Sequence, residues 1–175
     1  MAMIFQDSGS ALDPIVRIGK QFRELYKSHI EIDNDECDRR AIELLESVSL
    51  PNGADILRRY PHELSGGQLQ RVYIAMALAQ STDIIILDEP TTFLDIKYQK
   101  SIMQLVRDLN KSLGITIIMV LHDINQALAY SDNIIALLDG KVIKNDQAAN
   151  FFDETLLNRL YDADIKIEDG KVISW

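Results

Sequence analysis

The sequence has little of what would place a protein outside the cell or inside a membrane. It has one cysteine, Cys37, which excludes an intrachain disulfide and favours a reducing compartment. The first ten residues have no basic segment followed by an apolar one, so we expect no signal peptide. The longest strongly apolar run, Ile115 to Leu121, is far shorter than the roughly 18 residues of a spanning helix. We therefore expect a globular chain that does not cross a membrane, although it can still work at one.

The chain also lacks an excess of basic residues. It has 18 Lys and Arg against 27 Asp and Glu, which gives a net charge of -9 and a pI near 4.7. This balance argues against a protein that binds nucleic acid by neutralising phosphates, so we expect no nucleic-acid partner. A nucleotide site can nevertheless be locally positive inside an acidic protein. The 47% hydrophobic content over 175 residues predicts a folded chain of single-domain size.

The chain from about residue 8 to residue 80 has helical periodicity and no run that predicts a buried strand. Between Glu36 and Leu50, apolar residues recur at spacings of three and four, and Pro51 to Gly53 end the pattern. A second helix is expected over Ser65–Gln80, with Ser65 as its N-cap.

Residues 83 to 145 alternate between expected strands and helices. The strands are Asp83–Leu87 and Ile115–Leu121, both expected to be buried, and Ile134–Leu138; the helices between them are Ile96–Leu113 and about Asp123–Tyr130. This alternation implies right-handed crossovers and a parallel sheet, which binds ligands at the carboxyl ends of its strands. The two strongest strands end at Asp88-Glu89 and at His122-Asp123, where we expect the chemistry.

The remaining residues predict a small tail. Asp139-Gly140 and Asp169-Gly170 each predict a hairpin turn, with a short helix expected over Phe152–Tyr161. The expected organisation is a helical part over residues 1–82, an α/β core over 83–145 and a C-terminal helix and hairpin over 146–175.

Two segments have the residue types of a nucleotide site. The run that ends at Asp88-Glu89 places one carboxylate where it can hold magnesium through water and a second where it can orient or deprotonate an attacking water. A plain acidic turn closed by Pro90 is the alternative. Leu64 to Gln68 places two glycines after a serine N-cap, which exposes N–H groups to an anion, or it is an ordinary helix cap.

Taken together, the motifs resemble the ATP-binding-cassette (ABC) ATPase family. Phe-Gln at 5–6, LSGGQ at 64–68, DIIILDEPTT at 83–92, FLD at 93–95 and VLHD at 120–123 stand in the family's order and at its distances. The resemblance implies a P-loop NTPase-like α/β core, a parallel sheet with flanking helices, together with a helical signature subdomain. It also implies ATP and Mg²⁺ as cofactors.

The resemblance also implies a role for each matching residue, although alone His122 is more often structural and Gln6 is featureless. Gln6 and Asp88 match the magnesium-binding residues of the Q-loop and Walker B, and Glu89 matches the general base. His122 matches the switch histidine. The signature motif and the D-loop aspartate of the family face nucleotide that the partner subunit holds. The residues of this chain that match them are Ser65, Gly66, Gly67, Gln68 and Asp95.

One family motif does not occur in this sequence, the phosphate-cradling loop G-x-x-x-x-G-K-[ST]. We therefore expect the N-terminal strands of the fold to be missing and the chain to be inactive alone. A fragment that binds a permease or a partner cassette without catalysis is the main alternative. A DNA-repair ABC ATPase is disfavoured because the about 60 residues between Gln6 and Ser65 leave no room for its coiled coil.

Below the level of the family, the resemblance is mixed. Ile4–Pro14 and Tyr60–Glu63 resemble peptide and nickel importers, whereas residues 93–96 and 120–127 resemble importers of iron-siderophore, haem and cobalamin. We favour uptake of a metal or metal chelate. The implied partners are a transmembrane permease subunit, a second ABC ATPase subunit in a homo- or heterodimer and, indirectly, an extracytoplasmic solute-binding protein. The implied location is peripheral, at the cytoplasmic face of the cell membrane.

Overall fold

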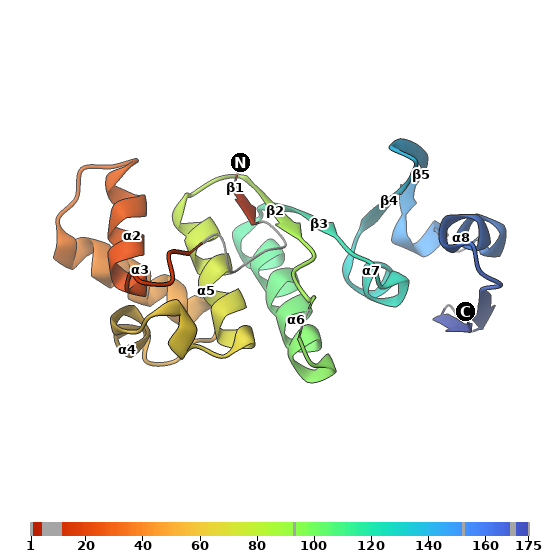
Figure 1. Cartoon of the computed structure of the whole chain (residues 1–175). Helices are drawn as coiled ribbons and strands as arrows, with labels where there is room; N and C mark the ends of the chain where they lie inside the picture. The colour runs from red at the N-terminus through yellow and green to blue at the C-terminus, as the bar shows by residue number, and fades with distance from the viewer. Residues whose placement is uncertain (1, 5–11, 93, 152, 169–170, 175) are drawn as a thin grey trace. The chain divides into compact units, whose positions relative to one another are not determined.

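The computed structural model describes residues 2–4, 12–92, 94–151, 153–168 and 171–174. They divide into two compact units, Met1–Val120 and Leu121–Trp175. The three-part division expected from the sequence stays a prediction. Figure 1 shows the elements of both.

The first unit contains the helices that the sequence predicts individually, and further helices within residues 8 to 80, a range that it predicts only as helical. Over the described residues they are α2 (Ile18–Lys27), α3 (Asn34–Ser47), α4 (Gly53–Arg58), a 3-10 turn at Pro61–Glu63, α5 (Gly66–Ala79) and α6 (Ile96–Leu113). Asp33 caps α3 by accepting a hydrogen bond from the Glu36 N–H, and Gly114 ends α6 in the left-handed conformation. The expected helices are therefore confirmed to within a few residues at each end.

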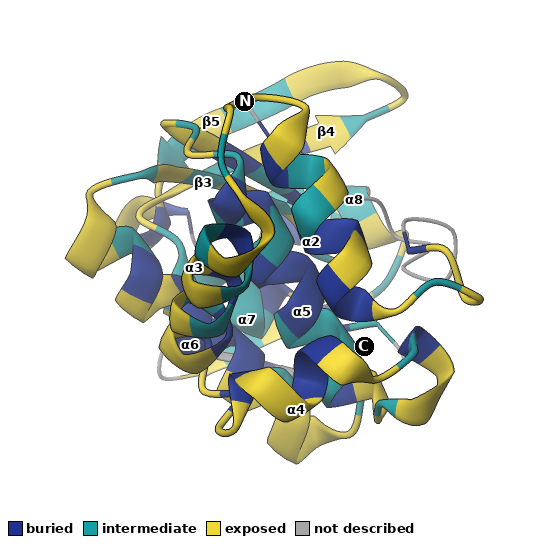
Figure 2. Ribbon diagram, turned by 90° about the vertical axis from the view of Figure 1, so that its left-hand side faces the viewer, coloured by how far each residue is buried: buried dark blue, intermediate teal, exposed yellow. Residues whose placement is uncertain are grey.

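Helix α5 joins the helical part of this unit to its sheet. It packs against α2 and α3 and also against β1 and α6. Its body is largely buried (Figure 2), because small and apolar residues occupy most of its faces: Val72, Tyr73, Ile74, Ala75, Ala77 and Ala79. Cys37 is fully buried on α3, as expected of a small apolar residue.

A three-stranded parallel sheet, in the order β1-β2-β3, lies in the same unit. Its strands are β1 (Ala2–Ile4), β2 (Ile84–Asp88) and β3 (Thr116–Val120). Ile4 pairs with Leu87, and Asp88 pairs with Val120. Helix α6 makes the crossover from β2 to β3 and buries Ile102, Leu105, Val106 and Leu109. The register places the carboxyl ends of the three strands at one edge.

Two expectations about the strands are wrong. The run Ile115–Leu121 forms a strand that is not buried, since the side chains of Ile118 and Val120 are 49% and 46% exposed. β3 is the outer strand of the described sheet, so one of its edges and one face lack a neighbour there. The strand expected at Ile134–Leu138 does not join the parallel sheet, because it pairs with the strand after it in a separate antiparallel hairpin.

The second unit consists of α7 (Ile124–Tyr130), the hairpin β4–β5 (Asn133–Leu138 and Lys141–Gln147), a 3-10 turn at Ala148–Asn150, α8 (Glu154–Tyr161) and the hairpin β6–β7 (Lys166–Glu168 and Lys171–Ser174). Asp139 and Gly140 both have positive φ, as the predicted two-residue turn requires. A small core holds the unit together: Ile124, Ala136, Phe151, Leu157, Ile165 and Val172.

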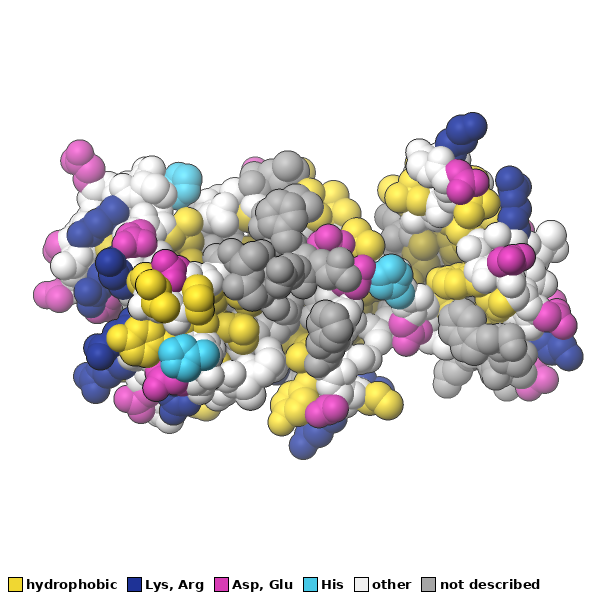
Figure 3. Space-filling model, viewed as in Figure 1, with side chains coloured by type: hydrophobic (Ala, Val, Ile, Leu, Met, Phe, Trp, Pro, Cys, Tyr) yellow, Lys and Arg dark blue, Asp and Glu magenta, His cyan; other side chains and the backbone are white. Residues whose placement is uncertain are grey.

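The surface of the described chain has mixed charge. Acidic and basic side chains lie intermingled over the helices at the left of Figure 3. Within the part of the chain that the structure describes, no helix combines the length and the apolar character needed to cross a bilayer.

Candidate functional site

The carboxyl edge of the parallel sheet carries the first part of the candidate site. β2 ends at Asp88, which is partly exposed, and Glu89 follows it at the same edge. Gln6 comes two residues after the end of β1, but it lies outside the described residues. The sequence prediction that the acidic pair stands at a strand end is therefore confirmed, whereas the position of Gln6 stays a prediction.

Glu89 adopts an unusual backbone conformation. Its φ is +47°, in the left-handed region that costs an ordinary residue about 1 kcal/mol or more. Two backbone hydrogen bonds maintain it: the Glu89 N–H donates to the Val120 carbonyl at 3.1 Å, and the Thr92 N–H donates to the Glu89 carbonyl at 3.2 Å. The Thr92 hydroxyl also donates to Oε2 of Glu89 at 2.8 Å. The residue that matches the general base therefore has its backbone fixed by Val120 and Thr92 and its carboxylate fixed by the Thr92 hydroxyl.

The residues at this edge fit a magnesium ion that is also bound by a nucleotide's phosphates. In the described ranges no group of three or more His, Cys, Asp or Glu could hold a metal ion by itself. Mg²⁺ usually binds one or two carboxylates and completes its octahedron with water and phosphate oxygens. Asp88, a partly exposed carboxylate, meets that need.

The second part of the candidate site is the amino end of α5. Ser65 is its N-cap: Ser65 Oγ accepts from the Gln68 N–H at 3.4 Å, and Gln68 Oε1 accepts from the Ser65 N–H at 3.0 Å. This capping box leaves the Ser65 hydroxyl hydrogen and the Gln68 amide N–H groups as donors. The helix also directs the positive end of its dipole outward at this point. The chemistry suits an incoming phosphate.

The two glycines of this segment are in different surroundings. Gly66 is exposed, and a Cβ there would make only an ordinary contact, 3.5 Å from Leu94. Gly67 is buried, and a Cβ there would lie 3.1 Å from the ring of Tyr98. The sequence prediction that glycine exposes backbone N–H groups to an anion suits the exposed Gly66. The structure gives Gly67 a second reason to be glycine, the close approach of α6.

Sequence reasoning missed three residues that organise this region. Tyr98 packs on Gly67, and Thr92 holds Glu89. Arg71 on α5 donates to the Val48 carbonyl at 2.5 Å and to Ser101 Oγ at 2.7 Å, so it links α5 to α3 and α6. Burial lowers the pKa of Arg71 from its ordinary value. None of these contacts follows from helical or strand periodicity. Only the contact of Thr92 could have been predicted, because Thr92 follows Glu89 by three residues in a turn.

Asp95 starts α6. Its carbonyl accepts from the N–H groups of Tyr98 and Gln99 at 2.8 and 2.9 Å, while its exposed side chain makes no capping hydrogen bond. Nε2 of Gln99 donates to the Leu94 carbonyl at 2.8 Å, which fixes the segment just before the helix. The Asp95 side chain therefore lies at the surface, at the start of α6, the helix that contacts Gly67.

His122 belongs to the second unit, two residues after the end of β3. Its side chain is exposed, and its carbonyl accepts a hydrogen bond from the Tyr161 hydroxyl at 3.2 Å. The next residue, Asp123, caps α7 through the N–H groups of Asn125 and Gln126. The structure brings Asp88 and Glu89 together within the first unit, and it describes His122 within its own.

A sequence model of the family described as "ABC transporter" matches residues 1–92. This match covers more than half of the chain. The chain belongs to the ABC transporter family. The matched range includes Ser65 to Gln68 and Asp88-Glu89, for which the roles of signature motif and Walker B pair stay predictions.

Individual relatives extend the likeness beyond residue 92. A Brucella abortus protein that carries the provisional name peptide import ATP-binding protein is 39% identical over 156 residues, or 89% of this chain and 47% of its own length. The oligopeptide transport ATP-binding protein OppD of Bacillus subtilis is 38% identical over 152 residues, or 87% of this chain and 42% of its own. This chain therefore spans less than half the length of these relatives.

A solved structure supports the fold. A dimeric structure of the ATP-binding cassette MJ0796, in a post-hydrolysis state bound to ADP and Pi, aligns with a TM-score of 0.71 and 36% identity. The alignment covers 86% of this chain and 63% of that one. The ABC cassette fold, with parallel strands and flanking helices, is therefore shown for this chain.

Proposed function

We propose that this chain carries the signature, Walker B and switch segments of the ATP-hydrolysing subunit of an ABC importer. The observation that carries the proposal is the conformation of Glu89. Its backbone is bonded to Val120 and its carboxylate accepts from the Thr92 hydroxyl, so a second carboxylate is fixed directly after Asp88, where it can orient an attacking water beside a magnesium-bound phosphate.

Each site residue has a distinct task in this proposal. Asp88, with Gln6, supports the Mg²⁺ that neutralises charge on the β- and γ-phosphates, and Glu89 orients the water. His122 donates a hydrogen bond to the γ-phosphate. The signature residues Ser65, Gly66, Gly67 and Gln68 close on nucleotide held by a second ABC subunit, with Asp95 at the contact between the two. The dimeric, ADP-bound cassette in the solved relative supports both the nucleotide and the second subunit.

The phosphate cradle is not among these 175 residues, since G-x-x-x-x-G-K-[ST] does not occur in them. Without that loop and its lysine, the phosphates lose most of their donors. Titration of the chain with a fluorescent ATP analogue and Mg²⁺ should therefore show no binding up to about millimolar nucleotide. Micromolar binding would mean that other residues of this chain replace the loop.

The solute that we propose is a peptide. The names of the two relatives, one a peptide import protein and the other an oligopeptide transport protein, support this class over the metal chelate that the residues at 93–96 and 120–127 favour. The proposed partners are a transmembrane permease, a second ATPase subunit and, through the permease, a solute-binding protein. The proposed place of work is the cytoplasmic face of the membrane.

A chimera tests the function and the solute class together. The segment of Bacillus subtilis OppD that matches this chain is replaced by the corresponding residues of this chain. ATP turnover by the purified chimera and oligopeptide uptake by cells that lack OppD are then measured. We expect turnover to be retained and to be abolished by Ser65→Arg, while ATP binding by the monomer is spared. A chimera that folds and binds ATP but does not turn it over would favour the alternative of a non-catalytic interaction module.

A further inference from the structure

The segment that carries His122 is attached to the C-terminal tail by contacts that span long stretches of sequence. The Tyr161 hydroxyl, at the end of α8, donates to the His122 carbonyl at 3.2 Å. The side-chain amide of Asn125, on the first turn of α7, makes two hydrogen bonds with the backbone of Val172 on β7. Asn125 Oδ1 accepts from the Val172 N–H at 3.0 Å, and Asn125 Nδ2 donates to the Val172 carbonyl at 3.3 Å.

The residues between these attachments are also fixed. Asp123 caps α7, accepting from the Asn125 N–H at 2.8 Å and from the Gln126 N–H at 3.2 Å. Ile124 is buried in the core that includes Leu157 of α8 and Val172 of β7. Every residue from His122 to Asn125 is therefore held by a tail contact or by the helix cap, while the His122 side chain remains exposed.

We propose that Tyr161 and Asn125 are positioning residues that set the orientation of the His122 imidazole through the backbone of residues 122–125. The inference rests on the proposed function, in which His122 contacts the γ-phosphate. A donor that is already oriented when the nucleotide arrives needs no reorganisation at the reaction step. Preorganisation therefore strengthens its hydrogen bond to the phosphate. The tail is thus a support for the switch histidine.

The ionisation of Tyr161 is consistent with this role. Burial, and to a smaller extent the negative charge of Asp123, raises the pKa of Tyr161. The shift acts in the direction that keeps the hydroxyl a donor to the His122 carbonyl. Replacing Tyr161 with Phe removes the hydroxyl that donates to the His122 carbonyl and keeps the ring at the end of α8.

Nuclear magnetic resonance of the full 175-residue chain tests the proposal. The chain has three histidines, His29, His62 and His122, so three imidazole signals can be assigned by single His→Gln variants. We expect Tyr161→Phe and Asn125→Leu to shift or broaden the His122 signal alone. Amide exchange at Val172 should also become at least about five-fold faster in Asn125→Leu, which removes both hydrogen bonds to the strand.

Tyr130→Phe is the matched control, because Tyr130 ends the same helix at the opposite end from His122. It should leave the His122 signal unchanged. A wild-type His122 signal in both test variants, or an equal shift in the control, would overturn the proposal. If Asn125→Leu unfolds the tail, Tyr161→Phe decides. The proposed function is tested separately by His122→Ala in the OppD chimera: unchanged turnover there would contradict the role of His122 but not its positioning by the tail.

Discussion

The two parts of the proposed nucleotide site in the first unit are supported in different ways. The signature segment is held mainly by its own neighbours in sequence, since Ser65 and Gln68 cap α5 reciprocally across three residues. The turn at Asp88-Glu89 combines local hydrogen bonds from Thr92 with a distant one, since the Glu89 N–H reaches the carbonyl of Val120 on the adjacent strand. The first is a local helix cap. The second is a left-handed turn that is also bonded to the sheet.

This difference has a consequence for stability. A local cap can be replaced by another capping residue at little cost, whereas a strained turn accepts only residues that tolerate its backbone. The contact of Gly67 with Tyr98 lies between these cases, because it joins the local helix to a helix 31 residues further along the chain. Substitutions at Glu89, Gly67 and Ser65 separate the three kinds of support.

The largest effect is expected at Glu89. Glu89→Val should lower the free energy of unfolding by about 2 kcal/mol, because a β-branched residue is disfavoured at positive φ. Glu89→Asn should cost less than about 0.5 kcal/mol, since Asn tolerates the left-handed region. Urea unfolding followed by circular dichroism measures both. Equal costs would mean that the backbone of this turn is not strained in solution.

Gly67→Ala should come next, at about 1.5 kcal/mol, because the new Cβ meets the Tyr98 ring at 3.1 Å. Gly66→Ala is the matched control and should be close to neutral, with its nearest neighbour at 3.5 Å. Tyr98→Ala should rescue most of the loss when it is combined with Gly67→Ala. A double variant that is as unstable as the sum of the two single variants would exclude this contact as the cause.

Ser65→Ala should cost about 1 kcal/mol through loss of the N-cap. Ser65→Asp keeps the cap and favours the helix dipole, so it should retain stability. It places a negative charge where the proposed phosphate would lie, and turnover of the OppD chimera should fall sharply. Stability and turnover that change together in both variants would indicate that Ser65 acts only as a cap.

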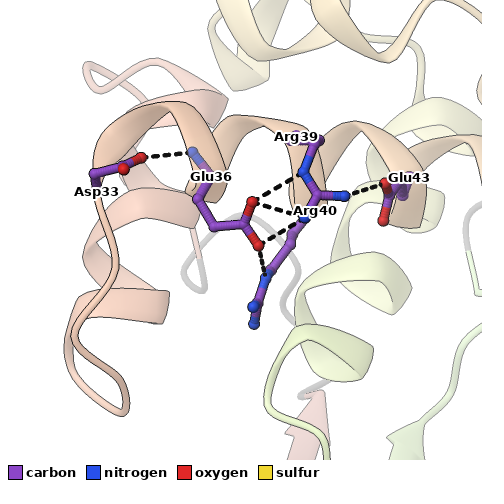
Figure 4. Close-up of polar contacts among 5 residues, drawn as sticks. All are labelled: Asp33, Glu36, Arg39, Arg40 and Glu43. Carbon is purple, nitrogen blue, oxygen red and sulfur yellow. Dashed lines mark hydrogen bonds and ion pairs between the residues drawn. The ribbon is translucent and has the colours of Figure 1, made fainter.

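The smallest effect concerns exposed local contacts on α3 (Figure 4). Hydrogen bonds from Arg40 and Arg39 lower the pKa of Glu36 below its ordinary value of 4.5. A carboxyl whose pKa is lowered on folding stabilises the protein above that ordinary value, and the contribution is lost as the pH falls through the lowered one. The stability difference between wild type and Glu36→Gln should therefore be present at pH 7, absent at strongly acidic pH, and weakened by salt. A difference that is the same at both pH values would exclude this charge effect.

Helix caps and turns could be predicted from the sequence, whereas contacts between distant segments could not. Ser65 as N-cap, Gly114 as the end of α6 and the Asp139-Gly140 turn all follow from residue types within a few positions. The pairing of β4 with β5 alone and the exposure of Ile118 were missed, because periodicity reports what a strand contains and not which strand lies beside it.

The candidate site shows the same limit. The position of Asp88 at a strand end was predictable from the apolar run before it. The left-handed conformation of Glu89 and the approach of Tyr98 to Gly67 depend on segments that are distant in sequence, and they became visible only in the structure.

The most direct test of the proposed role of Glu89 is Glu89→Gln in the OppD chimera. The substitution keeps the size of the side chain and the site of the Thr92 hydrogen bond but removes the base. We predict that ATP turnover falls by at least about 100-fold and that the variant becomes a stable dimer in ATP by analytical ultracentrifugation. Turnover at the level of the unsubstituted chimera would contradict the assignment of Glu89 as the residue that activates water.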